Sequence, residues 1–361
     1  MALRDKAGPD FGGSRRDFLT MAAGLSAMAA AGFAKAQFIA PPASSGAAEA
    51  ASDGPVSIEV KAEPILWFDR RDRARVRFGS LEYRSGLILT SSFPRFGGLS
   101  GWRVDPKGER FISFSDHGQW FTGRIVYEGR AMTGLADVES APMLGADGRP
   151  ITARGWFDSE SIALDGSLVY IGLERVNKVL RFDFSKGFTR SRGEVVALPP
   201  AASKLPTNQG LEALVFVPEG RPLAGTLIAM SERGLDKNGN LIAFLVGGPS
   251  PGQFSVRRTN DFDISDAVLL RSGDLLILER KFSWATGVGI RIRRIPLKSV
   301  VPGAVVDGPS IFEADLADEV DNMEGIDAHL TPEGETVLTM VSDDNFSIVQ
   351  RTLLLQFTLL A

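Results

Sequence analysis

The sequence contains no cysteine and only two histidines among its 361 residues. Without cysteine there are no disulfide bonds, zinc–thiolate sites, iron–sulfur clusters or cysteine nucleophiles. Two histidines also leave little for a histidine-rich zinc site or for phosphohistidine chemistry. The side chains that remain for acid–base or metal chemistry are mainly the 44 aspartates and glutamates. If the protein has a chemical activity, we therefore expect carboxylates to carry it.

Long apolar runs are also scarce, and the first one resembles an export signal. Residues 14–20 read Ser-Arg-Arg-Asp-Phe-Leu-Thr and precede an Ala- and Gly-rich run over 21–33 that is too short and weakly apolar to span a membrane. Ala34-Lys35-Ala36 then supplies a small-x-small cleavage pattern. The paired arginines before Phe-Leu resemble a bacterial twin-arginine signal, although an ordinary exposed basic tail is the alternative.

These features predict the organisation of the chain. We expect a signal peptide over residues 1–36, a flexible Ala/Ser/Pro/Gly-rich linker over 37–55 and one mature domain over 56–361. The signal would engage the export machinery and deliver a periplasmic protein that keeps no membrane span. The formal net charge is −4, and the excess of acidic residues argues against nucleic-acid binding.

The mature chain is predicted to be all-β. Short apolar alternations recur between turn signals, as in residues 168–171, 227–230, 275–278 and 336–340, and periodic helical segments are scarce. The 39 glycines agree with a fold that has many tight turns.

A degenerate repeat organises these strands into five hairpin units, which begin near positions 100, 160, 212, 266 and 324. About four strands in each unit of fifty to sixty residues is typical of β-propeller blades, and we predict five or six blades. The last unit lacks one strand, which an N-terminal segment around 76–82 or 86–91 would supply to close the ring. A β-sandwich with accidental internal similarity is the alternative.

The repeat also predicts where the carboxylates lie. Each unit has a polar or acidic residue before its first strand and a carboxylate after its second, and a hairpin brings these two places together. Like charges gathered there repel each other unless a cation neutralises them, and oxygen-only ligands favour Ca²⁺ or Mg²⁺. The carboxylates expected at one mouth of the propeller are those of Asp116, Glu160, Glu174, Glu212, Glu232, Asp266, Glu279, Glu324 and Asp343.

We predict three roles within this set and its basic neighbours. A divalent cation, expected to be Ca²⁺, would be held by Glu160, Glu212, Glu324 and Asp343. Water would be positioned by the catalytic residues Asp116 or Glu232. The anionic oxygens of a small substrate would be bound by Arg175, Arg233, Arg280 and His117. In the alternative interpretation, the same carboxylates only tie blades together through backbone hydrogen bonds and ion pairs.

Several motifs carry a resemblance to a known family. They include Phe96-Gly97-Gly98-Leu99-Ser100-Gly101, Ser115-Asp116-His117-Gly118, Asn208-Gln209-Gly210-Leu211-Glu212-Ala213 and Asp343-Asp344-Asn345-Phe346. In this order they resemble the esterase-like, phytase-like domain of exported bacterial proteins, over roughly residues 96–358. The fourth unit departs from the pattern, because Ser265-Asp266 stands where the other later units have Glu and a small residue.

The resemblance implies a propeller-like fold with an acidic site and hydrolysis of a phosphoester or another ester. We therefore expect an exported, metal-dependent hydrolase that acts on a phosphoester. The alternatives are a Ca²⁺-dependent lactonase or esterase, and a non-catalytic periplasmic binding propeller with a structural ion.

Overall fold

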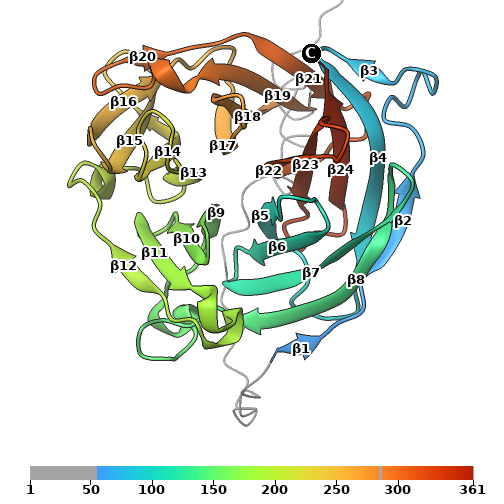
Figure 1. Ribbon diagram of the computed structural model, residues 1–361, viewed down its shortest axis with the longest axis horizontal. Coiled ribbons are helices and arrows are strands. Elements are labelled where there is room, and N and C mark those ends of the chain that lie inside the picture. Colours follow the sequence, from blue (N-terminus) through green and yellow to red (C-terminus); the bar gives the residue numbers. More distant parts are fainter. Residues whose placement is uncertain (1–54, 284–286, 361) are drawn as a thin grey trace, which may run out of the picture. The chain divides into compact units, whose positions relative to one another are not determined.

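The computed structural model describes residues 55–283 and 287–360, which form a ring of five small antiparallel sheets (Figure 1). The predicted signal peptide, and all of the predicted linker except Pro55, lie outside the described residues. The all-β prediction is confirmed, and the number of blades is five. No helix within the described ranges is long and apolar enough to cross a membrane.

Each blade contributes its first strand to the centre of the ring, where the five inner strands lie around a common axis (Figure 1). We call the region along this axis the channel. These strands are buried along most of their length, since they face the channel on one edge and neighbouring blades on both faces. The inner strands are β5 (Leu99–Val104), β9 (Ser159–Asp165), β13 (Leu211–Phe216), β17 (Asp263–Leu269) and β22 (Asn322–Leu330).

The strands of blades 1 to 4 follow one another outward in chain order. Blade 1 continues with β6 (Arg110–Ser115), β7 (Gln119–Glu128) and β8 (Ala131–Pro142), with β1 (Val56–Ser57) on its outer edge. Blade 2 continues with β10 (Leu168–Leu173), β11 (Lys178–Asp183) and β12 (Glu194–Val196). Blade 3 adds β14 (Thr226–Leu235), β15 (Leu241–Gly247), β16 (Gly252–Val256) and the parallel edge strand β20 (Val305–Val306), and blade 4 adds β18 (Asp274–Ser283), β19 (Gly287–Pro296) and β21 (Ser310–Asp315).

Blade 5 closes the ring with strands from both ends of the described chain. It contains β22, β23 (Thr336–Asp343) and β24 (Thr352–Leu359), followed by β4 (Leu81–Thr90) and β2 (Lys61–Ile65), while β3 (Arg77–Phe78) pairs with β4. The pairing of β4 with β24 runs from Leu81 opposite Leu359 to Leu89 opposite Thr352. The predicted closure by an N-terminal strand is therefore confirmed.

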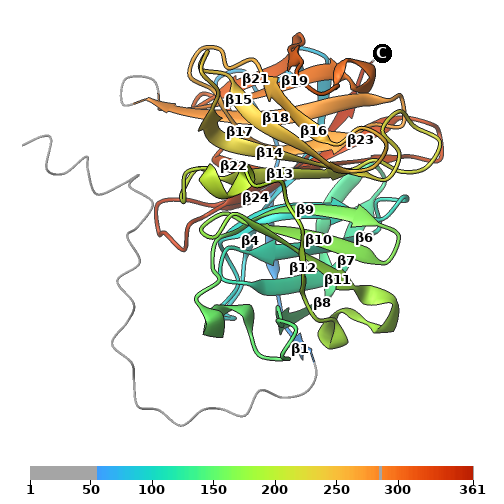
Figure 2. The ribbon, with the colours of Figure 1, turned by 90° about the vertical axis from the view of Figure 1, so that its left-hand side faces the viewer.

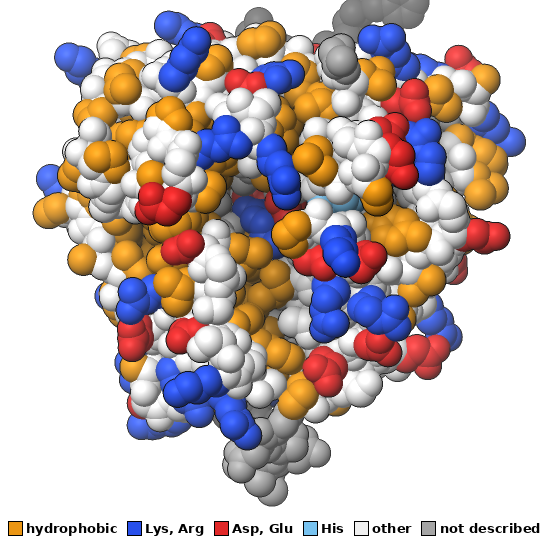
Figure 3. Space-filling model, viewed as in Figure 1, with side chains coloured by type: hydrophobic (Ala, Val, Ile, Leu, Met, Phe, Trp, Pro, Cys, Tyr) orange, Lys and Arg blue, Asp and Glu red, His pale blue; other side chains and the backbone are white. Residues whose placement is uncertain are grey.

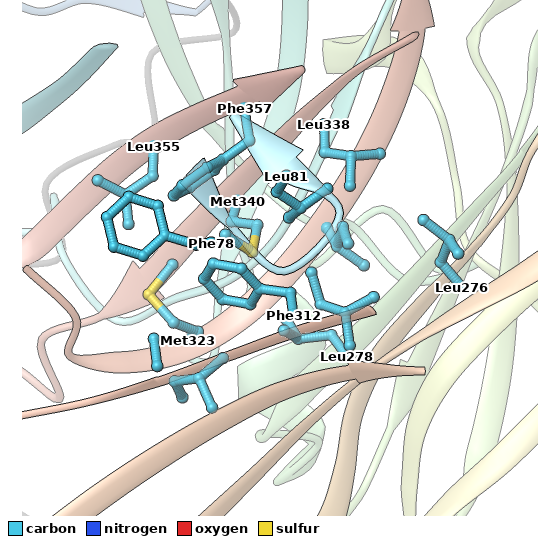
Figure 4. Close-up of a cluster of buried hydrophobic side chains, with 14 of the residues drawn as sticks. Phe78, Leu81, Leu276, Leu278, Phe312, Met323, Leu338, Met340, Leu355 and Phe357 are labelled. Carbon is cyan, nitrogen blue, oxygen red and sulfur yellow. The ribbon is translucent and has the colours of Figure 1, made fainter. Parts of the chain in front are cut away.

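The blades pack through apolar side chains that lie between neighbouring sheets. The largest cluster joins blades 4 and 5 and includes Phe78, Leu278, Phe312 and Phe357, which are almost completely buried (Figure 4). Phe78 comes from the N-terminal β3, so this cluster also fixes the closing segment. Short 3-10 helices connect some strands: η1 (Ile151–Arg154), η2 (Phe184–Lys186), η3 (Phe188–Arg190), η4 (Ala202–Lys204) and η5 (Leu297–Ser299).

The two ends of the channel differ in their loops. At one end, which we call the acidic mouth, the inner strands begin and the second strands of the blades end. At the other, which we call the turn end, each inner strand turns back into its second strand. Figure 2 shows the blades edge-on, with the β23–β24 loop projecting on the side of the acidic mouth and the C-terminus on the side of the turn end.

Candidate functional site

Each inner strand carries a β-bulge near its beginning. In every case one residue is skipped in the pairing with the second strand of the same blade. Bulges of this kind redirect a side chain away from the regular alternation of the strand. The skipped residues, all buried, are Ser100, Glu160, Glu212, Ser265 and Glu324.

The five bulges show which residues occupy equivalent positions in the five blades. Four of the predicted unit starts coincide with a bulge. The prediction for the fourth unit, Asp266, is one residue too far along, because the bulge of blade 4 is at Ser265. The residue two places after each bulge offers its carbonyl oxygen to Arg103, which lies across the middle of the channel. These carbonyls belong to Trp102, Ile162, Leu214, Ala267 and Ile326.

The prediction that Asp266 lies at the acidic mouth is therefore wrong. Its carboxylate forms a buried, bidentate ion pair with Arg103, with distances of 2.7 and 2.9 Å. One of its oxygens also accepts a hydrogen bond from the backbone of Ile326 at 2.9 Å. Asp266 is the counter-ion of a guanidinium that closes the channel at mid-height.

The second strands end in a second ring of polar residues beside the bulges. In each blade, the residue just before the bulge pairs with a residue of the second strand. The next residue along that second strand belongs to the polar ring. From blade 1 to blade 5, these residues are Asp116, Glu174, Glu232, Arg280 and Asp343. In blade 4 an arginine thus occupies the place that a carboxylate has in the other four blades. The sequence analysis groups Arg280 with Arg175 and Arg233, and this grouping is wrong by one residue. Arg175 and Arg233 each follow the ring residue of their blade, and in blade 4 the residue at that position is Lys281.

The one-residue offset in blade 4 also turns Glu279 away from the mouth. Its carboxylate lies on one face of the blade 4 sheet. There it forms ion pairs with two buried arginines of the neighbouring strand β19, Arg291 at 2.7 Å and Arg293 at 2.5 Å. The predicted place of Glu279 among the mouth carboxylates is wrong, because its register directs it into the packing of its own sheet. Glu279 is a structural ion-pair residue.

Arg280 lies among the carboxylates of the mouth and is 14% exposed. Its guanidinium donates hydrogen bonds to Glu232 at 3.2 Å and to Glu324 and Asn322. Burial alone lowers the pKa of Arg280, but Glu324, Glu232 and further mouth carboxylates outweigh it and hold this pKa well above its ordinary value. Arg280 is a fixed internal cation of the site.

Two groups of carboxylates come close enough to share a cation. Oxygens of Asp158, Glu160 and Glu174 all lie within 4.8 Å of one another, and so do oxygens of Glu174, Glu212 and Glu232. Glu174 belongs to both groups and is completely buried. Its Oε1 also accepts a hydrogen bond from the backbone of Gly210 at 3.1 Å, which orients it between blades 2 and 3. We call these five carboxylates the acidic pair of triads.

The remaining mouth carboxylates, Asp116 and Asp343, lie beside the triads in blades 1 and 5. Burial raises the pKa of Asp343, and the neighbouring charges of Asp116 and Glu324 raise it further. Asp343 also accepts a backbone hydrogen bond from Asn345 at 2.6 Å. Asp116 is 21% exposed, and one of its oxygens lies 3.7 Å from Nε2 of His117.

The structure brings some predicted site residues together and separates others. Glu160, Glu212 and Glu232 lie in the triads, whereas Glu324 binds Arg280 and Asn322. Arg233 is drawn toward the junction of blades 3 and 4 by Asp263, with 2.8 Å between its Nε and the carboxylate. Arg175 is exposed in the β10–β11 turn at the same end.

The sequence analysis assigns no metal role to three members of the triads. Glu232 is predicted there as a catalytic residue, Glu174 is placed at the mouth without a ligand role, and Asp158 is not among the predicted mouth carboxylates. Asp158 has a positive φ of 60°, which is a conformation that aspartate tolerates better than most residues. The hairpin pairing of β9 with β10 was the signal that could have linked Asp158 and Glu160 to Glu174.

The turn end of the channel is hollow as well, but its chemistry is different. A cavity of about 350 Å³ lies there, and Figure 3 shows the centre of this end hollowed. Its lining combines apolar side chains such as Leu164, Phe216 and Leu269 with charged ones. The charged residues are Arg103, Asp165, Arg221, Arg271 and Asp327. The carboxylate clusters lie only at the other mouth among the described residues.

The comparisons with solved structures find proteins of low similarity. Glutaminyl cyclase of Myxococcus xanthus is 11% identical to this chain, with a TM-score of 0.38. The alignment covers 73% of this chain and 92% of the cyclase. A protein of unknown function from Bacteroides thetaiotaomicron is 13% identical over 83% and 76% of the two chains, with a TM-score of 0.44. A putative oxidoreductase (glucose dehydrogenase) of Thermus thermophilus is 14% identical over 82% and 99%, with a TM-score of 0.32. These values are too low to carry a functional argument.

The sequence comparisons are more specific. None of the curated proteins matches this chain. A family model described as "Phytase-like: Esterase-like activity of phytase" matches residues 94–346. This segment contains all five inner strands, the five bulges and both carboxylate triads. The chain belongs to the phytase-like family.

Proposed function

We propose that this protein is an exported, metal-dependent hydrolase that acts on a phosphoester at the acidic mouth of the propeller. The observation that carries the proposal is Glu174, a completely buried carboxylate shared by two triads of acidic oxygens. Buried carboxylates at such short spacing are costly unless a cation neutralises them. Arg280 forms ion pairs with Glu232 and Glu324. Its single positive charge does not balance the five carboxylates of the triads, so a metal ion suits the remaining negative charge.

The donor set fits a hard divalent cation. The triads offer only carboxylate oxygens, and the sequence contains no cysteine, which disfavours softer metals. Ca²⁺ would be held by Glu160 and Glu174 with Asp158, or by Glu174 with Glu212 and Glu232. When bound, such an ion would supply Lewis-acid stabilisation of phosphoryl oxygens.

The protein's own residues would bind and orient the substrate. Arg280 would keep its contacts with Glu232 and Glu324 and present a positive charge toward anionic oxygens. Arg175, exposed at the same mouth, remains our candidate for an outer contact with the substrate. Arg233 would first have to leave Asp263, so we assign it a smaller share of binding than the sequence alone had indicated.

The proposed proton and water chemistry falls to Asp116. It is the more accessible of the two predicted catalytic residues, and its neighbour His117 is 45% exposed. Glu232 lies in a triad, so we now propose it as a cation ligand instead. Burial lowers the pKa of His117, an effect that Asp158 partly offsets, so the imidazole is neutral near pH 7 and adds little charge to substrate binding. Asp343 and Glu324 would line the remaining side of the mouth.

The test combines metal analysis with a substrate panel. The purified protein is assayed with a phosphomonoester, a phosphodiester and a lactone, with and without a chelator, and its metal content is measured. We expect one equivalent or more of Ca²⁺ and phosphoester turnover that the chelator abolishes. Turnover of the lactone alone would favour the lactonase alternative, and bound metal without any turnover would favour the non-catalytic propeller.

A matched pair of variants locates the ion. Glu212→Gln should lower metal affinity at least tenfold and reduce kcat/KM with it, because it removes one charged ligand of a triad. Glu333→Gln, at the turn end, removes the same charge far from the mouth and should change neither quantity. Full metal content and activity in Glu212→Gln would contradict the proposed site.

A further inference from the structure

One side of the acidic mouth is covered by a stacked pair of rings. His117 in blade 1 and Phe346 in the β23–β24 loop of blade 5 have ring centroids 4.6 Å apart and planes only 9° from parallel. Phe346 nevertheless remains 40% exposed and His117 45% exposed. The two rings therefore form an open aromatic surface and are not part of a buried core.

The backbone that presents Phe346 is strained. Asn345 and Phe346 both have a φ of 49°, in the left-handed region that a phenylalanine rarely adopts. Strain of this kind persists only where the surroundings fix it, and it concentrates at functional sites.

The surrounding contacts supply that fixation. Asp344 accepts hydrogen bonds from the backbone of Phe346 at 3.0 Å and of Gly98 at 2.9 Å, and from the hydroxyl of Thr352 at 2.9 Å. Asp343 accepts a further bond from the backbone of Asn345. Two consecutive aspartates thus hold the ring in place through a loop that is otherwise exposed.

The ring lies directly beside the candidate catalytic carboxylate. A Cβ atom on Gly98 would lie 2.4 Å from Oδ1 of Asp116 and also 2.4 Å from Cε2 of Phe346. The carboxylate and the ring edge therefore both pack closely against residue 98, and only glycine leaves room for them. Further along the same loop, the apolar residues Ile348 and Val349 are also fully or mostly exposed.

We propose that the His117–Phe346 pair is a binding surface for the apolar or aromatic part of the substrate, so that the enzyme prefers phosphoesters of such alcohols to those of polyols. The phosphoryl group would lie over the carboxylates and Arg280, and the organic group would contact the face of the rings. This inference rests on the proposed hydrolase function and specifies its substrate class. Phe346 is thus a specificity-determining residue.

The experiment compares an aromatic with a polar ester. The kcat/KM for 1-naphthyl phosphate and for glycerol 2-phosphate is measured in the wild-type protein and in Phe346→Ala and Phe346→Leu. For Phe346→Ala we expect about a tenfold loss with the naphthyl ester, mostly through KM, since aromatic contacts contribute on this order. Activity on glycerol 2-phosphate should stay within twofold, which shows that the variant is folded, and Phe346→Leu should lie in between.

The control is Phe282→Ala, which removes a phenyl ring of equal exposure, 40%, from the β18–β19 hairpin of blade 4. It should leave the ratio of the two kcat/KM values unchanged. Equal losses for both esters in Phe346→Ala, or an equal change of the ratio in Phe282→Ala, would overturn the proposal.

A binding measurement separates this inference from the proposed function. Calorimetry with 1-naphthylphosphonate and methylphosphonate, in the presence of Ca²⁺, requires no turnover. Tighter binding of the naphthyl compound that Phe346→Ala removes would support the surface even if neither ester is hydrolysed, and only the hydrolase proposal would then fail. Naphthyl binding that is equal in wild type and Phe346→Ala would overturn the inference itself.

Discussion

At the scale of single residues, Arg103 closes the middle of the channel with one buried guanidinium. It meets carbonyl oxygens from all five inner strands and the carboxylate of Asp266. Burial lowers the pKa of Arg103, and Asp266 more than compensates. A second carboxylate, Asp327, lies next to this pair and accepts a hydrogen bond from the backbone of Val104 at 2.6 Å. The separation of the two ends of the channel thus rests on very few charges.

Asp327 gives the protein a predictable dependence on pH. Burial raises its pKa from 3.8 to about 6, so the folded protein binds this proton more tightly than the unfolded chain does. Stability must then fall as the pH rises from about 4 to 6, by on the order of 3 kcal/mol for this group. Asparagine cannot ionise. In urea unfolding experiments, the free energy of unfolding of Asp327→Asn relative to that of the wild type should therefore rise by about this amount between pH 4 and 7. A difference between the two proteins that does not change with pH would contradict the assignment.

At the scale of elements, the β-bulge is the device that builds the acidic mouth. It lets an inner strand keep apolar residues between the blades and still direct one extra polar side chain to the mouth. The segment before the first bulge has an additional constraint, because Gly97 and Gly98 have positive φ values of 132° and 59°. Gly98 also lies against Asp116 and Phe346, so both its backbone and its missing side chain are required.

This constraint can be measured with two glycines of the same conformation. Gly98→Ala and Gly166→Ala both place alanine at a φ near 60°, which costs about 1 kcal/mol. A Cβ at Gly166 meets nothing within 4 Å, whereas at Gly98 it would overlap Asp116 and Phe346. We expect Gly98→Ala to lower the free energy of unfolding by about 1–3 kcal/mol more than Gly166→Ala. Equal losses in denaturant titrations would show that the mouth adjusts without strain.

At the scale of the whole molecule, the ring is held closed by strands from opposite ends of the described chain. β4 pairs with β24, and Phe68, Phe78 and Leu81 from the same N-terminal region are completely buried in the cluster between blades 4 and 5. Without this segment, β24 would become an exposed edge strand next to an uncovered apolar surface. The mouth depends on this closure, since Asp343 and Phe346 belong to blade 5.

Truncation tests the closure. A chain of residues 55–361 retains β2, β3 and β4 and should unfold cooperatively, as followed by circular dichroism during heating. A chain of residues 92–361 lacks these strands and should aggregate or lose the cooperative transition, because pairing and apolar burial in blade 5 are incomplete. A cooperative transition of similar midpoint in the shorter chain would show that four blades and a partial fifth are sufficient.

The sequence by itself determined the class of the fold and the approximate position of most of the mouth carboxylates. Apolar alternation and turn residues are local signals, so they predicted the hairpins, and their fifty- to sixty-residue spacing predicted the blades and the closing strand. The absence of cysteine left carboxylates as the chemical groups. Glu160, Glu212 and Glu324 could be assigned because each opens its unit with the same local pattern.

Only the tertiary structure decided which carboxylates meet. A shift of one residue reverses the direction of a side chain in a strand, and blade 4 differs from the repeat by that one residue. The shift places Asp266 on Arg103 and Glu279 inside its sheet, and it brings Arg280 into the ring of carboxylates. The stacking of His117 on Phe346 likewise joins residues more than two hundred positions apart, whose contact depends on the closure of the ring.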